Sequence, residues 1–334
     1  MPERDAQAGT EVDGRRRPCD QVRVRVPATS ANLGPGFDTF GLALTLYDDL
    51  VVTPGGSGIV VQVTGEGEND VPLDETHLVV RAIRHGLEAL GAPMPGFTLR
   101  CENRIPHGRG LGSSSAAIVG GLAVAYALAG VPLDRDRVVV LANELEGHPD
   151  NVAAAALGGF TIAWTGSGAS DGSSGGRAIK LKPAGEIGAI AYVPDNRVLT
   201  KEARGLLPGV VSHTDAAANA GKAALLVAAL TGYPELLLTA TEDRLHQEYR
   251  EPAMPESLAL VHKLRGSGLA AIISGAGPTV AVLAQPDGKT AGQSAGAGGR
   301  AASFRSVPEA PDGWTRHELG IDPVGVQVWS MEAG

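Results

Sequence analysis

The sequence predicts an α+β protein built from two domains. Its 334 residues are about twice the length of a typical domain, and hydrophobic residues make up 43% of them, enough for a sizeable core. Strand and helix patterns intermingle along the chain without the regular βαβ alternation of a doubly wound sheet. These observations favour α+β over α/β.

Charge and cysteine content exclude several classes of partner. Lys and Arg total 28 and Asp and Glu total 37, so the formal net charge is −9. This balance argues against a protein whose main work is to neutralise a phosphate backbone, and we expect no nucleic-acid partner. Cys19 and Cys101 are the only cysteines, too few for a disulfide framework or a Cys-rich zinc module, and they fit a reducing cytoplasm.

The N-terminal segment predicts neither export nor membrane insertion. Residues 1–20 are polar, and we expect a disordered tail without the apolar stretch of a signal peptide. The uncharged stretch 116–133 is broken by glycine and proline, and only 116–129 could form an uninterrupted helix, which is short for a membrane span. We therefore expect no membrane partner and a cytoplasmic protein.

The first half of the chain carries strand and helix signals in turn. Residues 22–26 alternate with period two, as a strand with one buried face does. Residues 49–53 and 59–63 flank the Pro-Gly-Gly sequence at 54–56, which predicts a hairpin. The other expected elements are a helix that Thr76 caps and that runs to residue 90, a strand at 97–101, and helices at 114–129 and 134–146.

The second half begins at a segment rich in glycine and serine. Residues 165–176 are either a domain linker or a long surface loop. Taken as the boundary, they give an N-terminal domain at 21–165 and a C-terminal domain at 166–334. The elements expected in the second domain are a strand at 187–193, helices at 215–230 and 234–249, strands at 270–273 and 279–283 around a glycine turn, and a loop at 287–302.

Residues 106–117 give the strongest indication of function. Gly108, Gly110 and Gly112 let the backbone bend tightly and approach a ligand. Three serines then open an apolar helix, whose first N–H groups have no partner within the helix. A glycine loop before a helix N-terminus is a ready anion site. The segment matches neither a Walker A loop nor the dinucleotide fingerprint, and the alternative is an ordinary serine-capped helix after a glycine turn.

Three other segments carry polar groups beside turns. Residues 29–38 place Asn32 and Asp38 on either side of a Gly-Pro-Gly turn, where they can meet an ammonium group or cap backbone groups. Residues 144–151 end one helix and supply acidic and histidine side chains, in the loop expected after it, that can hold a metal or stay solvated. Residues 274–279 form either a tight hairpin or a close approach to a ligand.

Together these segments resemble the GHMP kinase superfamily. Residues 106–117 resemble its phosphate-binding motif, and residues 274–279 resemble its C-terminal glycine motif. Residues 27–38 and 144–152, with the pattern at 199–204, are similar to the homoserine kinase family within it. The matching segments follow the family's order along the chain.

The resemblance implies ATP-dependent phosphorylation of the L-homoserine hydroxyl to O-phospho-L-homoserine, a step of threonine biosynthesis. It implies the two-domain GHMP kinase fold with the active site between the domains, ATP as co-substrate, Mg²⁺ as cofactor and a homodimer. Two alternatives stay open: a kinase for another small alcohol, and a non-catalytic nucleotide-binding relative.

The resemblance also assigns residues to the two substrates. His77 would approach the adenine, Ser114 with Glu144 would hold Mg²⁺, and Asn32 with Asp38 would receive the ammonium end of homoserine. The residues expected against the ATP phosphates are Pro106, Gly108, Arg109, Gly110, Leu111, Gly112, Ser113, Ser114 and Ser115.

The carboxylate end of homoserine would face Arg204 and Arg250, with Thr200 nearby. A guanidinium group pairs with a carboxylate in a bidentate fork, so these residue types fit that role. The remaining residues expected in the substrate pocket are His148, Asp150 and Asn151.

The catalytic set that the resemblance implies is Asn151, Asp150 and Arg204. Asp150 is the nearest candidate for a base, but no lysine adjoins it as in relatives that are assigned one. We therefore expect Asn151 to position the hydroxyl, while Mg²⁺ and the helix N-terminus stabilise the developing charge.

Overall fold

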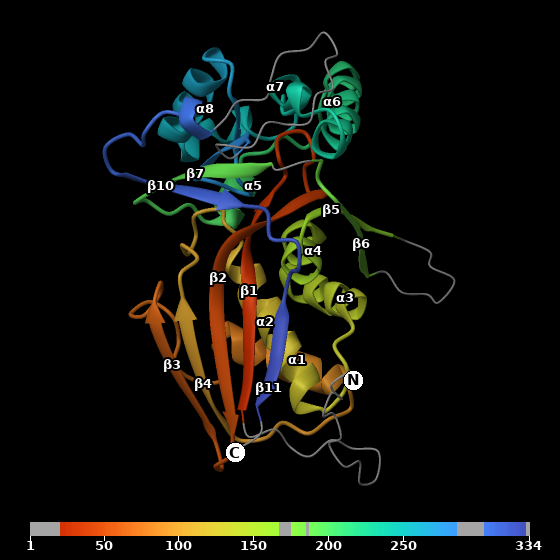
Figure 1. The fold of residues 1–334 in the computed structure, drawn as a ribbon, viewed down its shortest axis with the longest axis vertical. Helices are drawn as coiled ribbons and strands as arrows, with labels where there is room; N and C mark the ends of the chain where they lie inside the picture. Colours follow the sequence, from red (N-terminus) through yellow and green to blue (C-terminus); the bar gives the residue numbers. More distant parts are fainter. Residues whose placement is uncertain (1–20, 167–174, 185–186, 286–303, 332–334) are drawn as a thin grey trace, which may run out of the picture.

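The computed structural model describes residues 21–166, 175–184, 187–285 and 304–331. These residues form two β-sheets, each packed against its own helices, and Figure 1 shows them stacked along the long axis of the molecule. The mixture of sheets and helices confirms the predicted α+β class. The predicted N-terminal tail and the predicted loop at 287–302 lie outside the described residues.

The first sheet has seven strands in the described part of the chain. Five follow the order β11-β1-β2-β4-β3, while β5 pairs with β2 and β6 with β5; every pairing is antiparallel except β3 with β4. The strands are β1 (Gln21–Ala31), β2 (Phe40–Pro54), β3 (Ile59–Gly65), β4 (Phe97–Asn103), β5 (Phe160–Thr165), β6 (Gly176–Leu181) and β11 (Gln327–Met331).

The predicted hairpin around residues 54–56 is wrong. β4 lies between β2 and β3, antiparallel to the first and parallel to the second. Leu99 of β4 stands beside Val52 on one side and Val61 on the other, and all three side chains are buried on one face. The turn signal is correct, but strand pairing depends on which apolar faces meet, and here a strand from further along the chain fits both.

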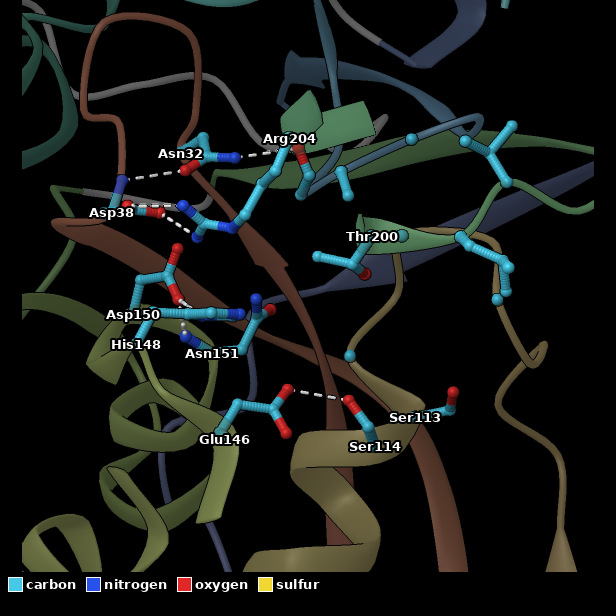
Figure 2. Close-up of a pocket in the computed structure, with 18 of the residues that line it drawn as sticks. Asn32, Asp38, Ser113, Ser114, Glu146, His148, Asp150, Asn151, Thr200 and Arg204 are labelled. Atoms are coloured by element: carbon cyan, nitrogen blue, oxygen red, sulfur yellow. Dashed lines mark hydrogen bonds and ion pairs between the residues drawn. The ribbon is translucent and has the colours of Figure 1, made fainter. Parts of the chain in front are cut away.

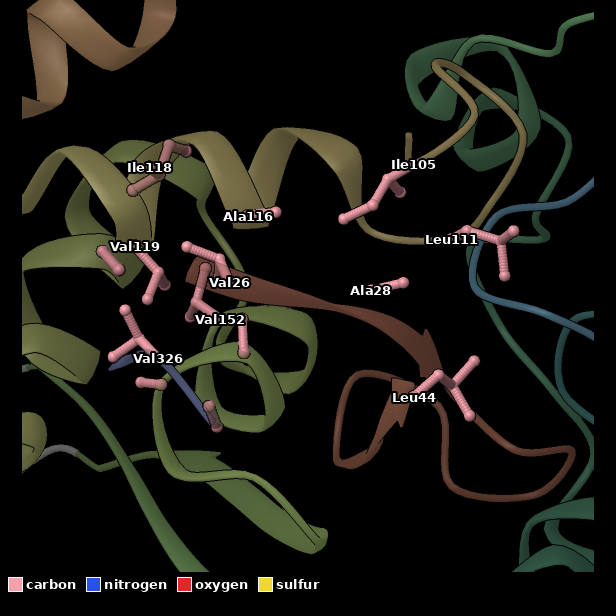
Figure 3. Close-up of a cluster of buried hydrophobic side chains, with 14 of the residues drawn as sticks. Val26, Ala28, Leu44, Ile105, Leu111, Ala116, Ile118, Val119, Val152 and Val326 are labelled. Carbon is pink, nitrogen blue, oxygen red and sulfur yellow. The ribbon is translucent and has the colours of Figure 1, made fainter. Parts of the chain in front are cut away.

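Four helices cover one face of this sheet: α1 (Leu78–Ala89), α2 (Ser113–Leu128), α3 (Arg135–Glu146) and α4 (Pro149–Leu157). α2 lies deepest, and Gly121 lets it approach α1 closely, since an added Cβ there would stand 2.6 Å from the Val79 carbonyl oxygen. Figure 3 shows part of the core between α2, α4 and the sheet; its labelled side chains are Val26, Ala28, Leu44, Ile105, Leu111, Ala116, Ile118, Val119, Val152 and Val326.

Two expectations about these helices need correction. α1 begins after His77, and Thr76 makes no cap, because its N–H and hydroxyl both donate to Asp74. The loop expected after residue 147 is instead α4, which begins at Pro149. Proline at the first position of a helix loses no intrahelical hydrogen bond, so Pro149 can start α4 two residues after Gly147 caps the end of α3.

The second sheet has the antiparallel order β10-β7-β9-β8. Its strands are β7 (Gly188–Pro194), β8 (Ala270–Ile273), β9 (Val280–Ala284) and β10 (Trp314–Gly320), and its helices are α5 (Thr200–Gly205), α6 (His213–Thr231), α7 (Leu237–Ala240) and α8 (Pro255–Gly266).

The helix predicted at 234–249 is interrupted. Only the short helix Pro234–Leu236, α7 and the 3₁₀ helix Glu248–Ala253 form there. Between them, the Asp243 carboxylate accepts hydrogen bonds from the backbone N–H groups of Leu245, His246 and Gln247. An aspartate that satisfies three backbone donors in this way holds a turn in place of a helix.

The two units are interleaved along the chain. β6 and β11 both come after residue 165, yet both pair within the first sheet, which differs from the expected division at 165/166. β5 and β6 pair within one sheet, so the segment between them does not join the two units, while residues 167–174 of the predicted linker or loop lie outside the described residues. In the described part of the chain, no helix is long and apolar enough to cross a membrane.

Candidate active site

A cavity of about 190 Å³ lies between the two units, where the resemblance places the active site. The first unit contributes the turn after β1 and the starts of α2 and α4, and the second contributes α5 and the β8–β9 turn (Figure 2). Thirteen of the predicted site residues line the cavity: Asn32, Asp38, Gly108, Gly110, Gly112, Ser113, Ser114, His148, Asp150, Asn151, Thr200, Arg204 and Arg250.

The glycine loop and the start of α2 form one wall. Gly112 is the N-cap residue with φ +72°, and no side chain caps this helix end. An added Cβ at Gly112 would stand 1.9 Å from the Thr29 hydroxyl oxygen, so only glycine fits. The first N–H groups of α2 therefore remain available to an anion, as the sequence predicts.

The β8–β9 turn braces the glycine loop from the second unit. The Ser274 hydroxyl donates to the Gly110 carbonyl at 2.6 Å, and the backbone N–H of Thr279 donates to the Arg109 carbonyl. The Arg109 side chain donates to the carbonyls of Pro194 and Asp195 and does not line the cavity. Among the residues predicted against the phosphates, Pro106 and Leu111 are buried and do not line the cavity either.

The predicted metal pair of Ser114 and Glu144 needs correction. Glu144 is half exposed and pairs with His85, at 3.0 Å between Oε2 and Nε2. The carboxylate that faces α2 is Glu146, whose Oε1 accepts hydrogen bonds from Ser114 at 2.7 Å and Ser115 at 2.9 Å. Two residues apart on a helix means about 200° around its axis, so only one of these glutamates can face the loop. Glu146 is the last residue of α3 and directly precedes its C-cap, Gly147.

The Ser114–Glu146 pair fits magnesium. Mg²⁺ prefers oxygen ligands and is held in phosphoryl-transfer sites by one or two protein groups together with substrate phosphates. One hydroxyl and one carboxylate at the N-terminus of α2 match that description. Within the described residues, no group of three or more His, Cys, Asp or Glu side chains could hold a metal. Side chains of these types alone would therefore not surround the ion.

The opposite wall carries opposite charges. Asn32 and Asp38 both have positive φ in the turn after β1, and the Asn32 Nδ2 donates to the Gly275 carbonyl at 2.7 Å. The guanidinium of Arg204, on α5, donates to both oxygens of Asp38 at 2.9 and 2.5 Å (Figure 2). The two groups expected to receive opposite ends of one substrate therefore pair with each other.

Arg250 supplies a second positive charge at this wall. It is 1% exposed, and its Nη1 donates to the Gly275 carbonyl at 2.9 Å while its Nε has no hydrogen-bond partner among the described residues. Burial, and then the charge of Arg204, lower the pKa of Arg250 to about 10, so it stays protonated at neutral pH. A buried cation without a carboxylate hydrogen-bonded to it favours an anionic ligand.

The start of α4 supplies a linked polar group. The Asp150 Oδ1 meets the His148 Nδ1 at 2.7 Å and accepts the Asn151 N–H at 2.8 Å. Burial lowers the pKa of His148, but the hydrogen bond and charge of Asp150 and the charge of Glu146 oppose it, and the net pKa is raised. The hydroxyl of Thr29, which the sequence analysis did not assign, donates to the Asn151 Oδ1 at 2.7 Å and fixes this amide.

His77 lies in a neighbouring cavity of about 230 Å³ that shares Ser113 and Ser114 with the first. Leu50, Val71 and Val79 give this cavity apolar walls, which suit the flat ring of a nucleobase beside the phosphate loop. His77 is 5% exposed, and its Nδ1 has no hydrogen-bond partner within the described part of the chain.

Comparisons with known proteins agree with this geometry. The family described as "GHMP kinases N terminal domain" matches residues 77–159, and "GHMP kinases C terminal" matches residues 217–299. Homoserine kinase of Streptomyces coelicolor is 54% identical over 92% of this chain and 94% of its own, and that of Streptomyces avermitilis is 53% identical over 93% and 97%. The chain belongs to the homoserine kinase family of GHMP kinases.

Solved structures of the family share the fold. A homoserine kinase from Cytophaga hutchinsonii has a TM-score of 0.77 at 23% identity, covering 97% of this chain and 100% of its own. A putative homoserine kinase from Listeria monocytogenes has a TM-score of 0.66 at 27% identity, covering 94% and 100%. The two-domain GHMP kinase fold that the motifs imply is confirmed.

The two GHMP kinase domain matches cover the site unevenly. The phosphate loop and the start of α4 lie inside the N-terminal match, and Arg250 and the β8–β9 turn lie inside the C-terminal one. Asn32, Asp38 and Arg204 lie outside both. The superfamily matches thus cover the phosphate wall and little of the charged wall, as expected if GHMP kinases share a nucleotide and differ in the acceptor.

Proposed function

We propose that this chain transfers the γ-phosphoryl group of ATP to the side-chain hydroxyl of L-homoserine, giving ADP and O-phospho-L-homoserine. One observation carries the proposal. A single cavity has an uncapped helix N-terminus on one wall, and one carboxylate and two guanidinium groups on the other. The first wall suits phosphates, and the second suits an amino acid zwitterion.

The charged wall supports an amino acid over a sugar or mevalonate. The ammonium group would take the Asp38 carboxylate, and the substrate carboxylate would take Arg204 and Arg250. Binding would exchange the present Asp38–Arg204 pair for two ion pairs of the same kind. A sugar offers neither charge, and mevalonate offers only the negative one.

The phosphate wall would position ATP and stabilise charge. The glycine loop and the first N–H groups of α2 would hold the phosphates. Ser114 and Glu146 would hold Mg²⁺, which when bound neutralises negative charge on the phosphates. Phosphoryl transfer depends mainly on such positioning and electrostatics, with little covalent work for the protein.

The α4 start supports a mechanism without a strong base. The Asp150 Oδ1 already meets His148 and accepts the Asn151 N–H. Asn151 lines the cavity with its oxygen held by Thr29, so its amide nitrogen is the group left to orient the acceptor hydroxyl. If Asp150→Asn lowered kcat more than about a thousandfold without raising KM, a base would be the better account.

A coupled ADP-release assay with ATP and Mg²⁺ tests the proposal on L-homoserine, L-threonine, L-serine, mevalonate and galactose. We expect strong turnover on homoserine alone. Turnover on another alcohol would support kinase activity but would contradict homoserine as the acceptor. ATP binding without turnover on any of them would favour a nucleotide-binding protein without catalysis. The homodimer and the cytoplasmic location remain predictions, which light scattering and cell fractionation can check.

A further inference from the structure

One aromatic ring lies next to both arginines of the charged wall. The guanidinium carbon of Arg204 is 5.4 Å from the centroid of the Phe37 ring, and that of Arg250 is 5.8 Å from it. Both distances fall within the 6 Å range in which a cation is attracted to an aromatic face. Phe37 does not line the cavity, so it would act on a ligand only through these arginines.

The two guanidinium groups need such a partner because they repel each other. The charge of Arg204 is one of the causes that lower the pKa of Arg250. Arg204 is drawn towards Asp38, and Arg250 towards the Gly275 carbonyl. The charges of Asp38 and Asp150 act on both cations. The Phe37 ring adds an aromatic face within 6 Å of both guanidinium groups, which also favours keeping them close.

The ring is itself held from the second unit. Its centroid is 5.2 Å from that of His246, at 32° between the planes. His246 is fully buried, and its Nε2 donates to the Gly34 carbonyl at 2.7 Å, three residues before Phe37. Asn219 donates to the next carbonyl, that of Pro35, at 2.8 Å. The turn thus has little freedom to move the ring.

We propose that Phe37 is a positioning residue for the substrate carboxylate: its ring holds the guanidinium groups of Arg204 and Arg250 side by side, and the His246 ring holds Phe37 in place. This inference rests on the proposed function, since it takes the arginines to bind a carboxylate. It assigns a specificity role to a residue that would not touch the substrate.

The test compares two acceptors that differ only in the carboxylate, L-homoserine and 3-aminopropan-1-ol. For Phe37→Leu we expect the KM for homoserine to rise about tenfold, the sum of two modest cation–π contacts. The KM for ATP, and kcat/KM for 3-aminopropan-1-ol, should stay within about twofold of wild type, because neither involves the carboxylate.

Phe40→Leu is the matched control. Phe40 ends the same turn and packs edge-on against Phe160 at 5.3 Å, and no guanidinium group lies over its ring among the described residues. We expect Phe40→Leu to lower the free energy of unfolding and to leave the KM for homoserine unchanged. An equal loss on both acceptors in Phe37→Leu would mean that the ring acts through Asp38 or the whole turn, and would overturn the inference. An unchanged homoserine KM would overturn it too.

Two variants of His246 separate its ring from its hydrogen bond. His246→Phe keeps the stacking and should leave the homoserine KM near wild type, while His246→Gln keeps a donor for Gly34 and should raise it about threefold. The reverse order would show that the hydrogen bond positions the turn and that ring stacking does not. Wild-type protein that turns over neither acceptor would refute the proposed function, and the inference with it. Wild type active on homoserine with an unaffected Phe37→Leu would refute the inference alone.

Discussion

The two walls of the cavity are built in different ways. On the phosphate wall, Ser114 and Ser115 meet Glu146 across 32 and 31 residues, between the consecutive helices α2 and α3 of one unit. On the charged wall, Asp38 meets Arg204 across 166 residues, and Asn32 meets Gly275 across 243. The phosphate wall is local in the chain, and the charged wall exists only when the two units meet.

This difference separates what the walls can do. The Ser114–Glu146 pair lies inside one unit and keeps its geometry when the units move relative to each other, although the β8–β9 turn of the second unit braces the glycine loop before it. A wall shared by two units changes its geometry with any such movement, so a ligand that binds it also holds the units together. Variants on the phosphate wall should therefore act mainly on kcat, and variants on the charged wall mainly on KM for the acceptor.

The strongest test of the phosphate wall is Glu146→Gln against Glu144→Gln. Loss of the Glu146 carboxylate should lower kcat about a thousandfold, since metal-assisted charge stabilisation is worth several kcal/mol. The Mg²⁺ concentration for half-maximal rate should also rise. Glu144→Gln removes only a half-exposed pair with His85 and should stay within about twofold. Steady-state kinetics at several Mg²⁺ concentrations measure kcat and the Mg²⁺ dependence of each variant. A larger loss of kcat in Glu144→Gln than in Glu146→Gln would support Glu144 as the metal ligand.

The charged wall is tested by Arg204→Ala. This change leaves Asp38 without its partner and removes one of the two cations for the substrate carboxylate. We expect kcat/KM for homoserine to fall about a hundredfold, mostly through KM, with the KM for ATP little changed. Arg84→Ala, which breaks an exposed pair with Glu75, is the control and should have no measurable effect. A drop confined to kcat would contradict the division between the walls.

The same difference explains which parts of the site could be predicted from the sequence. The glycine loop and the serines of α2 are adjacent in the chain, so their pattern alone indicates an anion site. Glu146 was missed because the choice between two glutamates depends on the rotation of α3 about its axis, which its amphipathic pattern leaves unresolved. Thr29 and Phe37 were missed because their roles lie in contacts with Asn151 and the two arginines, distant in sequence.

The fold shows the same limit. Helices with a clear start and stop, such as α2 and α3, could be predicted closely, while the hairpin at 54–56 could not, because β4 competes for the same strands. The strands β10 and β11 were not predicted at all. β11 is stabilised by pairing with β1 at the opposite end of the chain, and a five-residue strand carries little signal of its own.

Glycine substitutions test how tightly the phosphate wall is built. Gly112→Ala and Gly130→Ala both place a side chain at positive φ, +72° and +69°, which costs about 1 kcal/mol of unfolding free energy. Only at Gly112 does the new Cβ collide, at 1.9 Å from the Thr29 oxygen; at Gly130 it meets nothing within 4 Å among the described residues. Denaturant unfolding should show an extra loss of about 2 kcal/mol in Gly112→Ala, together with reduced kcat. Equal losses in the two variants would mean that the wall can relax.

The smallest effect is the pH dependence of the His148–Asp150 pair, which lies where the two walls meet. Burial lowers the pKa of His148, but the hydrogen bond and charge of Asp150 and the charge of Glu146 outweigh burial. The pKa of His148 is therefore raised above its usual 6.5. A raised pKa means that the folded state binds the proton more tightly, so the pair stabilises the fold fully below pH 6.5 and loses this contribution as the pH rises through the folded-state value. The difference in unfolding free energy between wild type and His148→Gln should therefore be larger at pH 6 than at pH 8. His262→Gln, which removes a surface pair with Glu248 whose side chains are 56% and 63% exposed, should change stability little at either pH. A difference that grows with pH would mean that burial prevails, so that the neutral imidazole is the form that the two walls hold.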